Sequence, residues 1–429
     1  MSTTIADIVI VGAGAAGLAT AIFARRTNPA RSVALLEGAK KPGAKILVSG
    51  GSRCNVTNAR VTDADFWGGR STTVRRILRA FSSQDAVAFF RDIGVSLHEE
   101  VDGKLFPDTN RSRDVLEALL RDTARAGATL ESGCRVLEVS PCSSPPGFTV
   151  TTTTGVLHAS SVVLATGGQS LPKTGSDGAG FAIAKRLGHT IVEPTPALAP
   201  LLLNDEDIHR ELSGVSQDVE LAVWTDGAID IRLRGAMLWT HFGVSGPVAL
   251  NASRHWLRAQ LDRRSAAITV NFRPGQRFDE VDADWTRLTA EHPRSSVQTM
   301  LGTMMPASAA AVLLRRLAID GATALAHFSR DDRRRLSRAL VEWPLGVAGT
   351  RGYNHAEATA GGVSLTEIDP STMQSRVCPG LYLVGEMLDV DGRIGGFNFQ
   401  WAWSTGYVAG RAIAAPPLTP PAPKPYAHP

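Results

Sequence analysis

The sequence predicts an α/β protein in which a parallel-sheet domain is interrupted by an inserted antiparallel β-barrel and a helical subdomain. Three observations predict this fold. Residues 8–37 read as a strand, a glycine-rich turn, an Ala-rich helix and a second strand. Short alternating segments separated by Asp-Gly or Gly turns dominate residues 197–273, as in a small barrel or sandwich. Residues 278–340 carry apolar residues at helical spacing and no strand signal.

The glycine-rich turn that follows the first strand is the most informative motif, with Gly12, Gly14 and Gly17 at GxGxxG spacing. In such a unit the first glycine allows a tight turn, the second lets the backbone approach a pyrophosphate, and the third lets the helix pack on the strand. The helix N-terminus offers free N–H groups to phosphates. Glu37 ends the second strand, where a carboxylate can bind a ribose hydroxyl. The unit predicts a bound dinucleotide; the alternative is an ordinary βαβ turn with an accidental pattern.

The remaining elements divide the chain into segments. Helical patterns cover 72–93, 111–127, 177–188 and 397–414, and a strand pair is expected near 130–139 and 147–158. The α/β pattern of the sequence ends at Pro194–Pro200 and resumes near 345. We therefore predict a discontinuous nucleotide domain interrupted by two insertions and followed by a tail: 1–192 and 343–415 for the nucleotide domain, 193–275 for the β-barrel, 276–342 for the helical insertion, and 416–429 for a Pro-rich disordered tail.

The composition is that of a globular protein. The 429 residues, 43% hydrophobic and 20% charged, are enough for two or three domains with a large core. A net charge of +4 indicates no strong polyanion partner, and Arg333–Arg335 stand beside acids, as on a solvated helix face. The four cysteines form no CxxC pair and no metal-binding spacing, so we expect no bound metal.

No targeting or membrane segment is evident in the sequence. The chain enters a core strand within a few residues of Met1, which leaves no room for a signal peptide. No apolar run approaches the roughly 20 residues that a membrane span needs. We therefore expect a cytoplasmic protein with no membrane partner. The oligomeric state stays open.

Two motifs near the C-terminus extend the dinucleotide prediction to FAD. The strand that ends in Gly385 and Glu386 places a carboxylate beside a sugar-like chain, here the ribityl hydroxyls. The run from Gly395 to Asn398 leads into the last helix, whose N-terminus would stabilise an anionic reduced flavin. The alternative is a glycine-rich turn that caps a surface helix. The strand end Ala165–Gly168 supports the FAD interpretation.

The segment from Lys45 to Asn58 joins small residues, a cation, a thiol and several amides soon after the ribose acid. A loop at this place can follow the pyrophosphate and reach the flavin ring. Arg53 could neutralise phosphate or reduced flavin, and Asn55 could bind ring or substrate oxygens. Cys54 is either a small buried packing residue or a redox thiol, and the absence of a neighbouring cysteine favours packing.

Acid–base candidates lie in two further motifs. His355 and Glu357 lie in a polar, glycine-rich stretch before the strand that ends in Gly385 and Glu386. They could act in acid–base catalysis, or they could be ordinary polar residues of a surface turn. His241 lies in the barrel insertion and is its best titratable candidate. Its alternative role is to hold a glycine-rich turn by hydrogen bonds. With Arg53, the two histidines are our candidate catalytic residues.

The chain resembles the YhiN/BaiN-type family of bacterial flavoproteins, to which aminoacetone oxidase and a bile-acid-pathway flavin reductase belong. The resemblance covers nearly everything from Ile8 to Ala412 and is carried by motifs such as GAGAAG, KILVSGGSRCNVTN, ATGGQSLPKTGSDGAG, GAMLWTHFGVSGP, TAGGVSLTEIDPSTMQS and GLYLVGEMLDVDGRIGGFNFQWAWSTG. It implies a glutathione-reductase-like FAD-binding Rossmann domain with a β-barrel and a helical insertion. Ser52 departs from the family pattern, which usually has a third glycine there.

Taken together, the motifs and the resemblance predict that FAD contacts residues from six segments of the chain. These are Gly12, Gly14, Ala15, Ala16, Gly17, Glu37, Gly38, Lys45, Ser49, Gly50, Gly51, Arg53, Cys54, Asn55, Thr166, Gly167, Gly385, Glu386, Gly395, Gly396, Phe397 and Asn398.

The predicted activity is an FAD-dependent oxidoreductase that moves a hydride between flavin N5 and a small organic substrate. Reductase and oxidase remain equal alternatives, with NAD(P)H or dioxygen as the second redox partner. The chain shows no second GxGxxG domain, and Gly175–Gly180 is too short for one, so NAD(P)H would bind transiently over the flavin. A flavoprotein that binds and modifies or senses RNA is the alternative from another class. We expect no nucleic acid, because no basic stripe with interleaved aromatic residues is evident.

Overall fold

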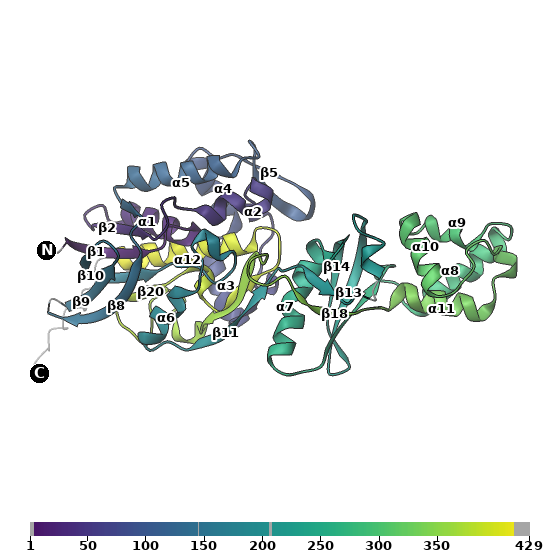
Figure 1. The fold of residues 1–429 in the computed structure, drawn as a ribbon. Coiled ribbons are helices and arrows are strands. Elements are labelled where there is room, and N and C mark those ends of the chain that lie inside the picture. The colour runs from purple at the N-terminus through teal and green to yellow at the C-terminus, as the bar shows by residue number, and fades with distance from the viewer. Residues whose placement is uncertain (1–3, 145, 206–207, 416–429) are drawn as a thin grey trace, which may run out of the picture.

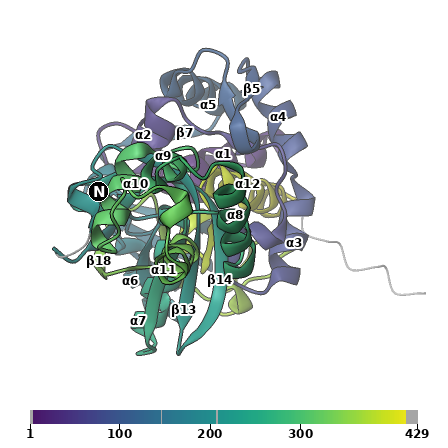
Figure 2. The same cartoon turned by 90° about the vertical axis from the view of Figure 1, so that its right-hand side faces the viewer.

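The computed structural model describes residues 4–144, 146–205 and 208–415. Three parts follow one another along its long axis: an α/β part that carries the N-terminus, a β-rich part in the middle, and a group of helices at the far end (Figure 1). Seen from that far end, the helices lie in front of the β-rich part (Figure 2). The tail predicted for 416–429 lies outside the described residues.

A seven-stranded sheet forms the centre of the α/β part, in the order β7-β2-β1-β10-β9-β8, with β20 paired to β10. Its first unit is the predicted strand–turn–helix–strand, formed by β1 (Thr4–Val11), α1 (Ala15–Thr27) and β2 (Val33–Glu37). β1 lies parallel to β2 on one side and to β10 (Val156–Leu164) on the other. The sheet and the glycine-rich turn confirm the predicted Rossmann fold.

The strand pair predicted near 130–139 and 147–158 is more complex in the structure. β7 (Thr129–Ser132) extends the parallel side of the sheet. A separate antiparallel meander follows, from β8 (Val136–Ser143) through β9 (Pro146–Thr152) to β10. The single apolar pattern therefore covers two strands, because Gly133 breaks the chain between them with a φ of +73°.

The helices predicted in the α/β part are present, one of them divided in two, and α2 is a further helix in a segment where a loop was expected. The pattern at 72–93 is two helices, because Ser82 accepts a hydrogen bond from the Asp85 N–H and starts a new one. α12 crosses α1 closely at Gly406, where a Cβ atom would come within 2.8 Å of the Ala16 carbonyl oxygen. The bounds are α2 (Ala44–Ser52), α3 (Ser71–Ala80), α4 (Ser83–Asp92), α5 (Ser112–Ala126), α6 (Ala179–Arg186) and α12 (Phe397–Ala414).

Short strands complete this part of the molecule. They form a three-stranded sheet in the order β3-β6-β5 and a two-stranded ribbon of β21 and β4. The bounds are β3 (Thr57–Asn58), β4 (Phe66–Gly68), β5 (Leu97–Glu99), β6 (Lys104–Pro107), β20 (Leu381–Leu383) and β21 (Val390–Gly392).

The middle part is the predicted antiparallel barrel, with the strand order β17-β16-β13-β14-β15-β12-β18. The two end strands are consecutive in the chain and separated only by Gly346, so one stretch of chain pairs with β16 and then with β12. This closes the sheet on itself. The bounds are β12 (Leu201–Leu203), β13 (Ser216–Thr225), β14 (Ala228–Thr240), β15 (Gly243–Ser245), β16 (Ala266–Asn271), β17 (Trp343–Leu345) and β18 (Val347–Thr350).

The barrel part differs from the sequence prediction in two ways. It contains a helix, α7 (Pro247–Leu261), which starts with a proline in its first turn and which the alternating pattern did not predict. β17 and β18 also pair within the barrel sheet, although 343–350 was assigned to the nucleotide domain. We therefore propose that the chain returns to the nucleotide domain after Thr350.

Helices occupy the predicted helical stretch at the far end. They share one hydrophobic cluster with the barrel, in which Trp285 of α8 and Trp239 of β14 are fully buried. The bounds are α8 (Phe278–Glu291), α9 (Val297–Gly302), α10 (Ala307–Arg316) and α11 (Arg330–Val341). Among the described residues, no helix is long and apolar enough to cross a lipid bilayer.

Two antiparallel strands, β11 (Ile191–Ala197) and β19 (Ala358–Val363), connect the α/β part to the barrel. A small hydrophobic cluster lies at this junction, and it contains Ala197, Leu198, Leu250, Ala358 and Ala360. Since Leu250 belongs to α7, the cluster joins the barrel helix to the connecting strands. We call this place the domain seam.

Candidate functional site

The glycine-rich turn after β1 is packed tightly on one side and open on the other. Gly12 has a φ of +103°, and a Cβ atom there would come within 2.5 Å of the Ala165 carbonyl oxygen. A Cβ atom on Gly17 would come within 1.9 Å of the Gly12 carbonyl oxygen, so the helix lies directly on the turn. A Cβ atom on Gly14 would meet nothing within 4 Å. The open side at the N-terminus of α1 therefore has room for a pyrophosphate.

Glu37 lies beside this turn at the end of β2. Its carboxylate oxygens accept hydrogen bonds from the Ala13 N–H at 2.9 Å and the Ala39 N–H at 2.8 Å. Each carboxylate oxygen keeps a further lone pair, so a ribose hydroxyl can still donate to it. The adjacent Gly38 would place a Cβ atom 3.4 Å from the Arg135 side chain.

The segment that begins with α2 bends sharply after Ser49. Ser52 adopts a φ of +65° and Cys54 a φ of +63°. Glycine reaches this left-handed region without steric cost, which gives a physical reason for the third glycine in the family pattern. Ser52 occupies the same conformation here at some strain.

Cys54 is fully buried. Burial raises the pKa of its thiol to about 12, and a hydrogen bond with Ser49 offsets only part of that effect. Because the thiolate is the reactive form of cysteine, a thiol that stays protonated supports the packing interpretation.

Arg53 and Asn55 both contact protein groups. The Arg53 guanidinium lies 2.6 Å from a Glu100 carboxylate oxygen and 4.0 Å from the centre of the Phe106 ring, so it faces the β5–β6 hairpin. With its amide oriented to satisfy its neighbours, Asn55 donates to the Thr57 carbonyl at 2.9 Å and accepts from the Gly396 N–H at 3.1 Å. Asn55 thus joins the loop to the start of α12.

Lys45 and Glu386 lie 341 residues apart in the sequence and form an ion pair of 2.5 Å. The other oxygen of Glu386 accepts a hydrogen bond from the Thr359 N–H at 3.0 Å. The Thr359 hydroxyl in turn accepts hydrogen bonds from the N–H groups of Gln169 at 2.9 Å and Ser170 at 3.1 Å. α2, the end of β20, β19 and the loop after β10 therefore meet at Glu386.

Thr359 and Ser170 were not predicted as site residues. Both lie in motifs that the sequence analysis singled out, TAGG and ATGGQS, and the link between these motifs is the buried hydrogen bond between the two hydroxyls, at 2.9 Å. Thr166 and Gly167 belong to the same loop, where a Cβ atom on Gly167 would lie 4.0 Å from a Glu386 carboxylate oxygen.

The start of α12 packs closely against the segment that contains Thr57. Gly396 has a φ of +92°, and a Cβ atom there would lie 2.4 Å from the Thr57 carbonyl oxygen. Asn398 braces the turn, since its side chain accepts from the Gly392 N–H at 2.8 Å and donates to the Gly392 carbonyl at 2.9 Å. Phe397 is buried. The N-terminus of this 18-residue helix provides positive potential next to Gly395.

The three candidate catalytic residues lie on different elements. Arg53 pairs with Glu100, as described above. His241 is exposed at the turn between β14 and β15, with its ring edge-on to Phe242 at a centroid distance of 5.1 Å. His355 is exposed in the turn before β19. No contact that would join them into one catalytic group is found among the described residues.

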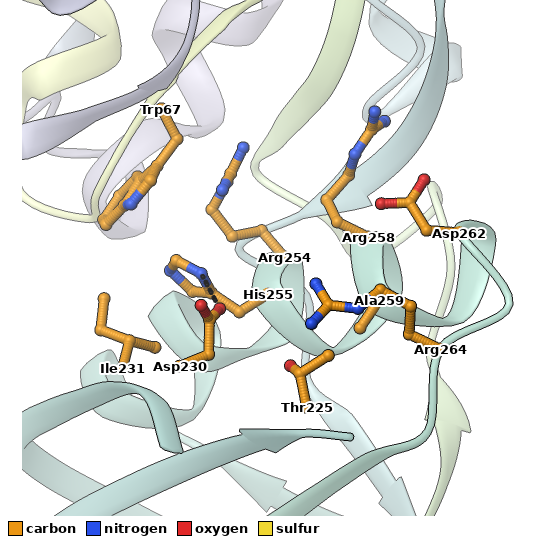
Figure 3. Close-up of a pocket in the computed structure, with 10 residues that line it drawn as sticks. All are labelled: Trp67, Thr225, Asp230, Ile231, Arg254, His255, Arg258, Ala259, Asp262 and Arg264. Atoms are coloured by element: carbon orange, nitrogen blue, oxygen red, sulfur yellow. Dashed lines mark ion pairs between the residues drawn. The ribbon is translucent and has the colours of Figure 1, made fainter. Parts of the chain in front are cut away.

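A cavity of about 310 Å³ lies where α7 of the barrel faces the β4–β21 ribbon (Figure 3). Arg254 of α7 binds Asp391 of β21 through two hydrogen bonds, of 2.6 and 2.9 Å, and lies 5.0 Å from the centre of the Trp67 ring. Burial and the charge of Arg254 lower the pKa of His255 to about 3. These residues could not be predicted from the sequence, because the alternating pattern around them does not indicate α7.

These features define the class of the protein: an FAD-binding Rossmann protein with an inserted barrel. The chain belongs to the HI0933-like family, since residues 6–412 match the description "HI0933-like protein Rossmann domain". The family is one of FAD-dependent oxidoreductases, and the cofactor is FAD.

Two relatives match nearly the full length of the chain. A 3-dehydro-bile acid delta(4,6)-reductase of Clostridium scindens is 32% identical over 410 residues, which cover 96% of this chain and 99% of the relative. A ribosomal RNA dihydrouridine synthase of Escherichia coli is 31% identical over 417 residues, which cover 95% and 98%. Among solved structures, a point mutant of the E. coli quinol fumarate reductase subunit FrdA matches with a TM-score of 0.50 and 15% identity, covering 96% of this chain and 70% of that chain, a likeness of fold alone.

The described residues fit FAD. The open side of Gly14 suits the pyrophosphate, Glu37 has free acceptor capacity for the ribose, and the N-terminus of α12 suits the flavin end. Among these residues, no group of three or more His, Cys, Asp or Glu side chains is placed to hold a metal ion.

Proposed function

We propose that this protein is an FAD-dependent reductase of a carbon–carbon double bond conjugated to a carbonyl, with NAD(P)H as the transient electron donor. The names of the two relatives support one shared chemistry. A 3-oxo compound with unsaturation at carbons 4 and 6 and a uracil ring both contain a double bond conjugated to a carbonyl. In both cases reduction adds a hydride at the β carbon and a proton at the α carbon.

The observation that carries this proposal is the junction at Glu386. Four separate segments meet there, next to the domain seam, and the barrel continues from the same connecting strands. A substrate held at the seam would lie between the FAD domain and the barrel, where inserted domains commonly bind ligands. We propose that the predicted contact residues from Gly12 to Asn398 hold FAD and that the barrel, with His241, governs the substrate.

Bound FAD supplies the hydride chemistry, and the protein supplies position and charge. We propose that the N-terminus of α12 stabilises negative charge on the reduced cofactor. Lys45 is held in place by its ion pair with Glu386, and we propose that its ammonium group lies near the ribityl chain.

RNA as the substrate is a second candidate, favoured by a specific observation. Ribosomal RNA dihydrouridine synthases of E. coli and Haemophilus influenzae are 31% and 29% identical to this chain. This is the alternative from another class that the sequence analysis left open. An oxidase that passes electrons to dioxygen is the third alternative, and the relatives named above do not favour it.

One sequence of measurements separates these functions. The protein is mixed anaerobically with NADH and with NADPH, and the loss of flavin absorbance is followed. The reduced protein is then exposed in separate portions to a 3-oxo-Δ4 steroid, to unmodified ribosomal RNA, and to air. Fast bleaching with fast reoxidation by the steroid or the RNA supports a reductase and identifies its substrate class. Absence of bleaching, with fast reoxidation of dithionite-reduced protein by air, would instead favour the oxidase.

A further inference from the structure

Glu357 lies at the domain seam, directly before β19. Its backbone N–H donates to the Leu198 carbonyl at 3.2 Å, on the opposite side of the connection. Leu198 is buried in the small hydrophobic cluster of the seam, and so is Ala358, the residue that follows Glu357. The backbone of Glu357 is therefore fixed, although its side chain is not part of a packed core.

The direction of the Glu357 side chain follows from the strand. Side chains at alternate positions of an extended chain share a face, so Glu357 shares a face with Thr359. The Thr359 hydroxyl lies against Gly168, where a Cβ atom would come within 2.4 Å of it. The charge of Lys45 acts on the Glu357 carboxylate. Glu357 therefore faces the side of the seam where the loop after β10 and the Lys45–Glu386 pair lie.

The surroundings of this carboxyl group differ from those of an ordinary surface glutamate. The side chain is exposed to solvent, and nearby protein still partly desolvates its carboxyl group. This desolvation raises the pKa of Glu357, and the charge of Lys45 offsets only part of the effect. A carboxyl group that holds its proton above the usual range is suited to act as a general acid.

We propose that Glu357 is the group that gives a proton to the α carbon of the substrate. This inference rests on the proposed function. The β carbon receives a hydride, with its electron pair, from the reduced cofactor, and the electrons of the double bond move to the α carbon. The O–H bond of Glu357 breaks and a C–H bond forms at the α carbon. The products are a saturated carbonyl compound, oxidised FAD and a Glu357 carboxylate, which regains its proton from water; NAD(P)H supplies the two electrons.

Other acidic groups near the seam are less suited to this role. His355 lies in the turn before β19, two residues further than Glu357 from Ala358 of the seam cluster. The Tyr353 hydroxyl interacts with the charges of Glu193 and Arg258, and burial raises its pKa to about 12. Glu386 is paired with Lys45 and bonded to the Thr359 N–H, so its carboxylate is already occupied.

The test uses Glu357→Gln, which keeps the shape of the side chain and removes the acidic proton. Glu291→Gln on α8 is the matched control, since that glutamate is exposed on the far helical part and pairs with Arg287 at 3.6 Å. FAD content, anaerobic reduction by NAD(P)H, and reoxidation by ferricyanide are measured, because none of them needs a proton on carbon. Reoxidation by the 3-oxo-Δ4 steroid and by ribosomal RNA is measured as well. An independent readout is the infrared band of the protonated carboxyl group in the apoprotein, followed as the pH rises and taken as the difference between wild type and variant.

We expect Glu357→Gln to match the wild type in FAD content, NAD(P)H reduction and ferricyanide reoxidation. Reoxidation by the carbonyl substrate should fall by about 100-fold or more. The carboxyl band lost in Glu357→Gln should persist to higher pH than the band lost in Glu291→Gln. Reoxidation within about threefold of the wild type would overturn the inference, and so would two bands that disappear at the same pH. If wild-type protein reduces neither substrate, the proposed function fails, and the infrared band still tests the proton on Glu357.

Discussion

Arg254 Nε and Nη2 donate to the two carboxylate oxygens of Asp391 at 2.6 and 2.9 Å, although the two residues belong to different parts of the molecule. Arg254 lies on the barrel helix α7, and Asp391 lies on the strand that leads into the glycine turn before α12. Asn251 of α7 also accepts a hydrogen bond from the Ile394 N–H in that turn, at 2.8 Å. The barrel therefore helps to hold the turn next to the predicted flavin position.

Asp391→Ala should lower the free energy of unfolding by about 3–5 kcal/mol, because it leaves the Arg254 charge buried without its partner. The two side chains are only 10% and 1% exposed, so water cannot replace the lost contact. Urea unfolding measures the change. Arg264→Ala is the control, since its pair with Asp226 is about half exposed and solvent screens it, so its loss should change stability little. Equal losses in the free energy of unfolding would show that the buried pair stabilises the protein no more than the exposed pair does.

His255 should make the protein less stable in mild acid. Burial lowers its pKa in the folded state from 6.5 to about 3. Between these values the unfolded chain binds a proton that the folded protein does not, so stability falls as the pH falls through this window. Urea midpoints of wild type and His255→Gln, compared from neutral pH to about pH 4, measure the difference. The two curves should converge as the pH falls, and parallel curves would mean that His255 does not titrate as described.

Glu37→Ala should weaken FAD binding by about 1–3 kcal/mol, because a charge-assisted hydrogen bond to the ribose is lost. FAD titration of the apoprotein, with a check of folding, measures this. Glu131→Ala is a useful control, because Glu131 lies opposite Leu36 on the neighbouring strand β7. If folded Glu37→Ala and Glu131→Ala bind FAD with equal affinity, Glu37 does not bind the ribose.

Cys54→Ser should keep its FAD and its turnover. The buried thiol has a pKa of about 12, so it holds its proton at neutral pH and cannot act as a thiolate. Flavin content and turnover on one preparation decide the matter. A variant that retains FAD and loses all turnover would favour a redox role for Cys54.

Short-range features of the site could be predicted from the sequence. The turn from Gly12 to Gly17 and the acid at Glu37 belong to one local unit, so their spacing alone carries their geometry. The end of β20 and the start of α12 were recognised for the same reason. Each of these motifs has its physical cause within a few dozen residues.

Features that depend on distant contacts could not be predicted. Arg53 pairs with Glu100, 47 residues away, and nothing in the local sequence indicates that partner. The bond between Lys45 and Glu386 joins residues that were each expected at the cofactor but not in contact. α7 was missed because it lies among alternating strands, and its buried face is set by the barrel.

The anaerobic reaction of the purified, FAD-loaded protein with NAD(P)H, followed by a conjugated carbonyl substrate, tests the central claim most directly. The account predicts that NADH or NADPH bleaches the flavin and that the 3-oxo-Δ4 steroid or ribosomal RNA restores its colour without oxygen. The saturated product should form in equal amount to the flavin reoxidised. A flavin that neither nicotinamide cofactor reduces, or a reduced flavin that only oxygen reoxidises, would contradict the assignment as a reductase.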